Sequence, residues 1–167
     1  DRAGERAQAR SAHGEAIGQL RKAIVLLETQ PAGAERDARE LSLQLALGGS
    51  LIAARGYAHP ETAAAYERAV ALGAAVGDAP RLGVARTGLA ICYYTRGEVE
   101  RGRALAAEVL AAAEARGDRE QALFGHHNVA FPEHFQGRFV SSLAHGERAI
   151  ALYDPAQHHG HARMLGG

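Results

Sequence analysis

The sequence has no tryptophan and few other aromatic residues, with five tyrosines and four phenylalanines among 167 residues. Alanine and leucine are abundant instead, whereas β-branched residues are sparse. Alanine and leucine favour helices, and strands are enriched in β-branched and aromatic residues. The composition therefore predicts an all-α fold.

Cysteine is nearly absent as well, since Cys92 is the only one. A single thiol cannot form an intramolecular disulfide, so nothing indicates an oxidising compartment and we expect a cytoplasmic protein. Cys92 adjoins Tyr93 in an apolar helical stretch, which predicts a buried, inert thiol rather than a nucleophile.

Long apolar runs are missing too. The longest stretch without a charged residue, 41–54, has 14 residues, whereas a membrane-spanning helix needs about 20. The first ten residues are charged and include neither an apolar signal core nor an initiating methionine. We expect no membrane association, and we expect the chain to be part of a longer protein.

Net charge is absent, because 19 basic residues balance 19 acidic ones. Nucleic acids and anionic membranes attract clusters of positive charge, so neither is a predicted partner. Lys22 is the only lysine, and neither a phosphate-binding Gly-x-x-x-x-Gly-Lys loop nor a His-Glu-x-x-His zinc motif occurs. The inventory predicts no enzyme activity, no catalytic residue and no cofactor.

An internal repeat is the main positive feature of the sequence. Residues 67–72 (Glu-Arg-Ala-Val-Ala-Leu) return almost unchanged as 147–152 (Glu-Arg-Ala-Ile-Ala-Leu), two periods of 40 later. Such self-similarity is typical of solenoids, whose helical units stack to bury their apolar faces. Glycines recur at the same interval: Gly77 and Gly117, each followed by Asp, and Gly97 and Gly137, with Gly56 preceding Gly97 by 41.

Apolar spacing, glycines and prolines together set the predicted helices. Pro60 suits a first turn, Gly77 a left-handed C-terminal cap and Asp78 an N-terminal cap. Within one predicted helix, Gly48 and Gly49 lower helix propensity, so we expect a close helix–helix approach there. After a helical remnant that ends near residue 12, with a turn near residues 13–14, the predicted helices span 15–28, 34–55, 60–76, 80–96, 98–116, 118–136 and 138–153.

These helices predict an α-solenoid of about four antiparallel pairs in one repeat domain over 1–155, with pairs near 1–30, 34–76, 79–116 and 118–154. The tail, 156–167, is rich in His and Gly and is predicted to be irregular. Three of its histidines, His158, His159 and His161, could attract metal, but no cysteine lies near them and we predict no metal site.

The spacing between residues 86 and 154 resembles the tetratricopeptide (TPR) repeat. That family pairs a large and a small apolar residue, places an aromatic three positions later, and has Gly at the turn. The period here is 40 rather than the family's usual 34, and HEAT-like repeats are the structural alternative. Arg86 and His126 stand where the family favours tryptophan, and Glu133 where it favours an aromatic. The matching positions are Leu89, Ala90, Tyr93 and Gly97 in the third pair, and Val129, Ala130 and Gly137 in the fourth.

Four short stretches resemble the TPR region of large bacterial ATPase or adenylate/guanylate cyclase-type signalling proteins. They are residues 43–48 (Leu-Gln-Leu-Ala-Leu-Gly), 55–57 (Arg-Gly-Tyr), 64–69 (Ala-Ala-Tyr-Glu-Arg-Ala) and 152–158 (Leu-Tyr-Asp-Pro-Ala-Gln-His). The resemblance implies a regulatory arm that binds a peptide or protein partner, or another domain of the same protein. Truncated repeat ends also predict self-association as a homo-oligomer.

In TPR domains the first helix of each pair lines a concave groove that binds peptides. Three of the four phenylalanines fall on one such helix beside histidine and asparagine, and aromatic anchors flanked by polar groups suit a peptide-binding site. The alternative is that these phenylalanines are core residues. Carried over by position, the predicted partner-binding residues are Thr87, Ile91, Tyr94, Phe124, His127, Asn128, Phe131, His134 and Phe135.

Pro132 falls inside the same predicted helix, where its ring removes one backbone hydrogen bond. The sequence allows two outcomes, a kink that shapes the groove or an end of the helix at that point. Two other functions stay open beside partner binding. One is a helical domain that senses a small ligand, and the other is a structural spacer or dimerising arm.

Overall fold

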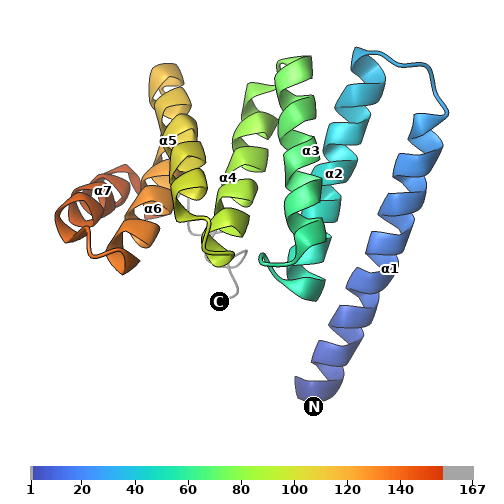
Figure 1. Ribbon diagram of the computed structural model, residues 1–167, viewed down its shortest axis with the longest axis horizontal. Helices are drawn as coiled ribbons and strands as arrows, with labels where there is room; N and C mark the ends of the chain where they lie inside the picture. The colour runs from blue at the N-terminus through green and yellow to red at the C-terminus, as the bar shows by residue number, and fades with distance from the viewer. Residues whose placement is uncertain (1, 156–167) are drawn as a thin grey trace. The chain divides into compact units, whose positions relative to one another are not determined.

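A computed structural model of the chain describes residues 2–155, with side chains described from residue 12 onward. Over these residues the protein forms seven α-helices and no strand, which confirms the all-α prediction. The predicted irregular tail and its histidines lie outside the described residues. The helices are α1 (Arg2–Glu28), α2 (Ala34–Arg55), α3 (Pro60–Val76), α4 (Ala79–Thr95), α5 (Val99–Arg116), α6 (Arg119–Phe135) and α7 (Phe139–Leu152) (Figure 1).

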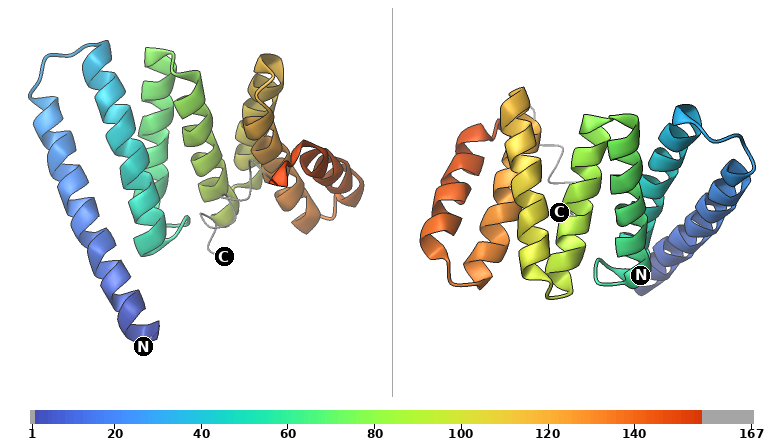
Figure 2. Two further views of the ribbon diagram at one scale, coloured as in Figure 1. Left: turned by 180° about the vertical axis from the view of Figure 1, so that it is seen from behind. Right: turned by 45° about the horizontal axis from the view of Figure 1, so that its top comes forward.

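The chain divides into two compact units, Asp1–Leu105 and Ala106–Gly167, where the sequence predicts one repeat domain over 1–155. The boundary falls within α5, whose first turns belong to the first unit. In the first unit, α1 to α4 run alternately up and down, each helix packed against the next (Figures 1 and 2). In the second unit, α6 packs against α7. Each unit has its own apolar core.

Glycine and aspartate set the helix ends much as predicted. Gly77 ends α3 in the left-handed conformation, with φ 71°. The next residue, Asp78, caps α4 by accepting a hydrogen bond from the backbone N–H of Arg81 at 3.0 Å. Gly117 and Asp118 repeat the device before α6, where Asp118 accepts from the N–H of Gln121. From α2 onward, the predicted bounds agree with the structure to within one residue.

The predicted turn near residues 13–14 is wrong, because α1 continues without interruption from Arg2 to Glu28. A glycine in a helix interior costs only about 1 kcal/mol relative to alanine, and Gly14 stands among good helix formers. A glycine marks the end of a helix when another helix-ending residue stands beside it. Gly33 has such a neighbour in Pro31, and both follow the end of α1.

One buried cluster of the first unit forms around Tyr66, which is packed between two helices that approach it closely. A Cβ added at Gly48 on α2 would lie 2.8 Å from the Tyr66 ring, and one at Gly88 on α4 would lie 2.4 Å from it. The predicted close approach therefore holds at Gly48, whereas a Cβ at Gly49 would meet nothing within 4 Å.

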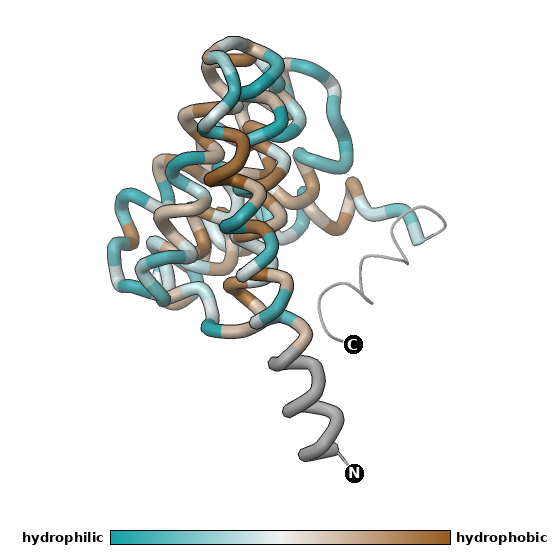
Figure 3. Tube along the Cα trace, turned by 90° about the vertical axis from the view of Figure 1, so that its right-hand side faces the viewer, coloured by the Kyte–Doolittle hydropathy of each residue, from teal (hydrophilic) through white to brown (hydrophobic). Residues whose placement is uncertain are grey.

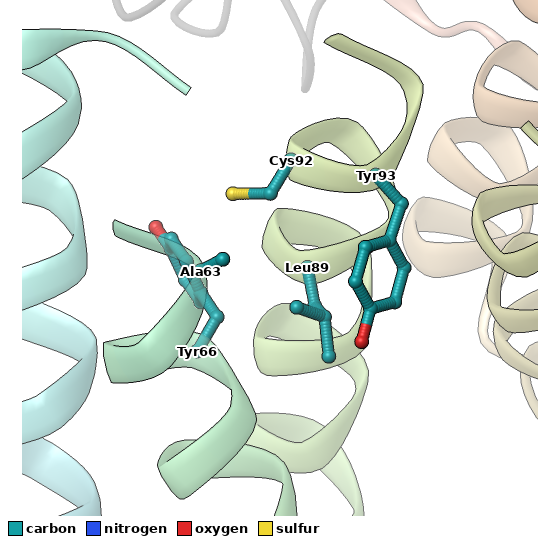
Figure 4. Close-up of a cluster of buried hydrophobic side chains, with 5 residues drawn as sticks. All are labelled: Ala63, Tyr66, Leu89, Cys92 and Tyr93. Carbon is teal, nitrogen blue, oxygen red and sulfur yellow. The ribbon is translucent and has the colours of Figure 1, made fainter. Parts of the chain in front are cut away.

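Five buried residues form the cluster around this ring, as Figure 4 shows: Ala63, Tyr66, Leu89, Cys92 and Tyr93. Burial raises the pKa of Tyr66 to about 12 and that of the Cys92 thiol to about 11. Cys92 has no exposed surface, so it is the buried free thiol that the sequence predicts.

Apolar and polar residues alternate along the helices (Figure 3). Such a pattern lets the apolar positions of a helix pack against its neighbours while the polar positions face solvent. Within the described part of the chain, none of the helices combines the length and the apolar character that crossing a bilayer requires.

The contacts of Tyr66 predict opposite effects of alanine at two helical glycines. Gly88→Ala should lower the urea midpoint of unfolding, because overpacking costs about 1–3 kcal/mol and outweighs the roughly 1 kcal/mol of helix propensity gained. Gly49→Ala gains the same propensity in open space and should raise the midpoint. Circular dichroism during urea titration measures both, and a Gly88→Ala protein at least as stable as wild type would contradict the packing described.

Candidate functional site

The predicted partner-binding residues fall on two helices in separate units. Thr87, Ile91 and Tyr94 lie half-buried on α4 in the first unit. The other six lie on α6 in the second unit, where they differ in exposure. Asn128 is buried and Phe124 is half-buried, whereas four are exposed: His127, Phe131, His134 and Phe135.

An open groove of about 330 Å³ runs between α6 and α7 and includes three of those exposed residues. Because it lies within one unit, the groove is the candidate site. We call it the α6–α7 groove. Its α6 side consists of His127, Ala130, Phe131 and His134, and its α7 side of Ser142, Leu143, Gly146, Glu147 and Ile150.

A row of aromatic rings follows the α6 side of the groove and continues past its end. Phe131 and Phe135 meet edge to face, with ring centroids 5.0 Å apart. The ring centroid of His134 lies 5.5 Å from the centroids of both Phe135 and Phe139, and the centroid of His127 lies 6.2 Å from that of Phe131. Phe131 is 58% exposed and Phe135 is 74% exposed. Within the described structure these two phenylalanines are surface residues rather than core residues, whereas Phe124 is partly buried.

The α7 side of the groove is apolar and exposed as well. No residue of α7 is buried, and Leu143 and Ile150 are 64% and 76% exposed. The prediction missed this helix because the resemblance to TPR domains assigns the groove to the first helix of a pair. The sequence repeat could have predicted the role of α7. Residues 147–152 repeat a segment of α3, and the apolar face of α3 is buried against its neighbours, so α7 is expected to have an apolar face as well.

Contacts between α5, α6 and α7 hold the groove in shape. Ser142 on α7 donates a hydrogen bond to the backbone carbonyl of Ala130 at 2.9 Å. On the other side of α6, a Cβ at Gly125 would lie 3.1 Å from Leu110 of α5, so these helices pack closely. Pro132 does not end α6, which continues to Phe135. The predicted alternative of a break at Pro132 is therefore wrong.

A histidine pair lies behind the groove, where α6 packs on α7. His126 is 3% exposed, and its Nδ1 lies 2.9 Å from Nδ1 of His145. Its other ring nitrogen, Nε2, lies 3.6 Å from a carboxylate oxygen of Glu114. Since the two Nδ1 atoms can share only one proton in a hydrogen bond, neutral imidazoles fit this contact and two imidazolium ions do not. The predicted site residues include neither histidine of this pair.

The pKa of His126 is lowered, mainly by burial and further by the positive charges of His145 and Arg148, while Glu114 acts in the opposite direction. Among the described residues, no group of three or more His, Cys, Asp or Glu side chains is placed to hold a metal ion.

Comparison with known proteins assigns no function to this site. No protein-family model matches the chain, and no curated protein or solved structure matches it either. The chemistry of the α6–α7 groove is therefore the basis for the function proposed below.

The histidine pair predicts a loss of stability in acid. Because the pKa of His126 is lower in the folded chain than its ordinary 6.5, the unfolded chain binds more protons, and stability should fall as pH drops below about 6.5. One such group contributes at most about 1.4 kcal/mol per pH unit. Urea midpoints between about pH 5 and 8 measure the slope.

His126→Phe should reduce that slope, and His127→Asn, which removes the adjacent exposed histidine, is the matched control. Equal slopes for the two variants would show that the buried pair does not govern the pH dependence.

Proposed function

We propose that the chain is a non-catalytic protein-interaction module that binds an apolar segment of a partner protein in the α6–α7 groove. The observation that carries the proposal is the exposure of large apolar side chains on both sides of one groove. Phe131 lies on the α6 side, with the exposed Phe135 just beyond the end of the groove, and Leu143 and Ile150 lie on the α7 side.

Contiguous exposed apolar surface of this kind marks interaction sites in proteins. Aromatic anchors supply much of the binding energy in such sites, because they bury a large area at a small cost in side-chain entropy. Polar groups at the edge, here His127, His134 and Glu147, can fix the register of the bound segment through hydrogen bonds.

The open form of the groove favours a macromolecular segment over a small molecule. Small-ligand sites are concave and bury most of the ligand surface. Here Phe131, Leu143 and Ile150 each expose more than half of their surface, so a small molecule would remain largely in water. A peptide or helix can cover the groove along its whole length.

The predicted architecture of stacked helix pairs suits an interaction module. The residue spacing between 86 and 154 resembles that of TPR repeats, although the period is 40 rather than 34, and four short stretches resemble the TPR region of large bacterial signalling proteins. The antiparallel packing of α1 to α4 in the first unit supports this assignment. We propose accordingly that the chain is the TPR-like arm of a larger signalling protein.

Selection from a phage-displayed library of random peptides tests the proposal and requires no identified partner. We expect enriched peptides to be apolar and to lose about thirtyfold in affinity for Phe131→Asp or Ile150→Asp, since removing a central anchor typically costs 2 kcal/mol or more. Both side chains are exposed, so both variants should fold, as circular dichroism would verify.

Val25→Asp is the matched control, because Val25 is also an exposed apolar residue, 61% exposed, but lies on α1 in the first unit. It should leave binding unchanged. A library that yields no binder, or binders that tolerate both groove substitutions, would overturn the proposed function.

A further inference from the structure

The repeat in the sequence relates α7 to α3. Residues 67–72 lie on α3 and their repeat, 147–152, lies on α7, so each α3 position corresponds to the α7 position 80 residues later. On this correspondence, the α7 residues that line the groove have defined counterparts. Leu143 corresponds to Ala63, Gly146 to Tyr66, Glu147 to Glu67 and Ile150 to Val70.

In the first unit, that face of α3 is covered by a helix. Leu89, Cys92 and Tyr93 of α4 pack against Ala63 and Tyr66, as Figure 4 shows, and Val70 borders the same cluster. A polar contact accompanies the apolar ones, because the Tyr93 hydroxyl donates to a carboxylate oxygen of Glu67 at 3.1 Å. The chain therefore contains its own example of what binds such a face.

We propose that the occupant of the α6–α7 groove is an amphipathic helix of a partner protein with the contact pattern of α4. This inference rests on the proposed function and specifies the kind of partner. The helix presents an aliphatic side chain to Leu143 and Ile150, as Leu89 does to α3. One turn further on, it presents a hydroxyl group that donates to Glu147, as Tyr93 donates to Glu67.

The partner helix differs from α4 at one position, because the groove has room where the first unit has none. In the first unit the Tyr66 ring occupies the space beside Gly88, so that a Cβ there would come within 2.4 Å of it. At the corresponding position α7 has Gly146, and a Cβ added there would meet nothing within 4 Å. A bulky side chain at the Gly88 position of the partner fills this space.

A helix fits the spacing of the groove better than an extended peptide does. Leu143, Glu147 and Ile150 follow one another at helical intervals of four and three residues, so they form a single ridge along α7. Ridges of this kind pack into the grooves of another helix, as in known complexes of helices bound in apolar grooves.

Two synthetic peptides with the sequence of residues 79–96 test this inference against the full chain. One carries Gly88→Phe and the other Gly88→Ala, and both carry Cys92→Ala to prevent oxidation. Alanine favours the helix more than phenylalanine does, so propensity alone would favour the alanine peptide. We expect the phenylalanine peptide to bind wild type about tenfold more tightly, measured by fluorescence anisotropy, because its ring buries apolar surface beside Gly146.

Gly146→Tyr restores the bulk that Tyr66 supplies in the first unit, and it should reverse this preference in favour of the alanine peptide. Glu147→Gln should weaken both peptides a few-fold, and it should have no effect on peptides in which Tyr93→Phe removes the donor hydroxyl. Ile150→Asp should abolish binding of both peptides, whereas Val25→Asp on α1 should not change it.

Three results would overturn the inference. The first is equal binding of the phenylalanine and alanine peptides, and the second is binding that tolerates Ile150→Asp. The third is a wild-type dimer in sedimentation that Ile150→Asp dissociates, which would make a second copy of the chain the occupant. If library peptides bind the groove while both α4 peptides fail, the proposed function stands and the helical partner is excluded.

Discussion

The packing of Tyr66 against two glycines is the constraint on which the first unit depends. Helices with side chains at their crossing point keep their axes about 8–10 Å apart, and a large ring in the interface normally sets that distance. Gly48 and Gly88 let α2 and α4 approach α3 from either side of one ring. The Tyr66 ring of α3 therefore contacts both α2 and α4, and Leu89, Cys92 and Tyr93 of α4 pack in the same cluster. Substitutions at any of these positions act on all three helices.

The second unit uses the same repeat without this ring. Gly146 stands at the corresponding position, and the face of α7 that would bury a tyrosine is exposed. The α5–α6 packing at Gly125 and the buried His126 hold α6 in place. The unit therefore has a closely packed inner side and an apolar outer side, and the packing of the inner side lowers the cost of ordering α6 on binding.

The sequence predicts the helices well because their ends depend on local chemistry. Gly77, Asp78 and Pro60 act through backbone conformation and capping, which neighbouring residues determine. The turn predicted at Gly14 is wrong because a lone glycine lowers propensity without supplying an alternative structure, so α1 continues through it.

The candidate site is less predictable, because it depends on contacts between helices. The resemblance to TPR domains implies a groove position for Phe131 and Phe135 and leaves a core position as the alternative, and both side chains lie on the surface. His126 and His145 are 19 residues apart on different helices, and no periodicity brings two such positions together. The α7 side of the groove is open to prediction from the repeat, since Ala63 and Val70 on α3 indicate which positions of α7 are apolar and face a neighbour.

The absence of buried residues on α7 also affects the dynamics of the second unit. A helix opens locally at a free energy set by the buried contacts that it loses, and none of the residues of α7 is buried. Its amide hydrogens should therefore exchange with solvent sooner than those of α3, although the two helices share a sequence repeat. An occupant of the groove would slow that exchange along the whole of α7. Binding at one ridge would therefore protect the amide hydrogens of the entire helix from exchange.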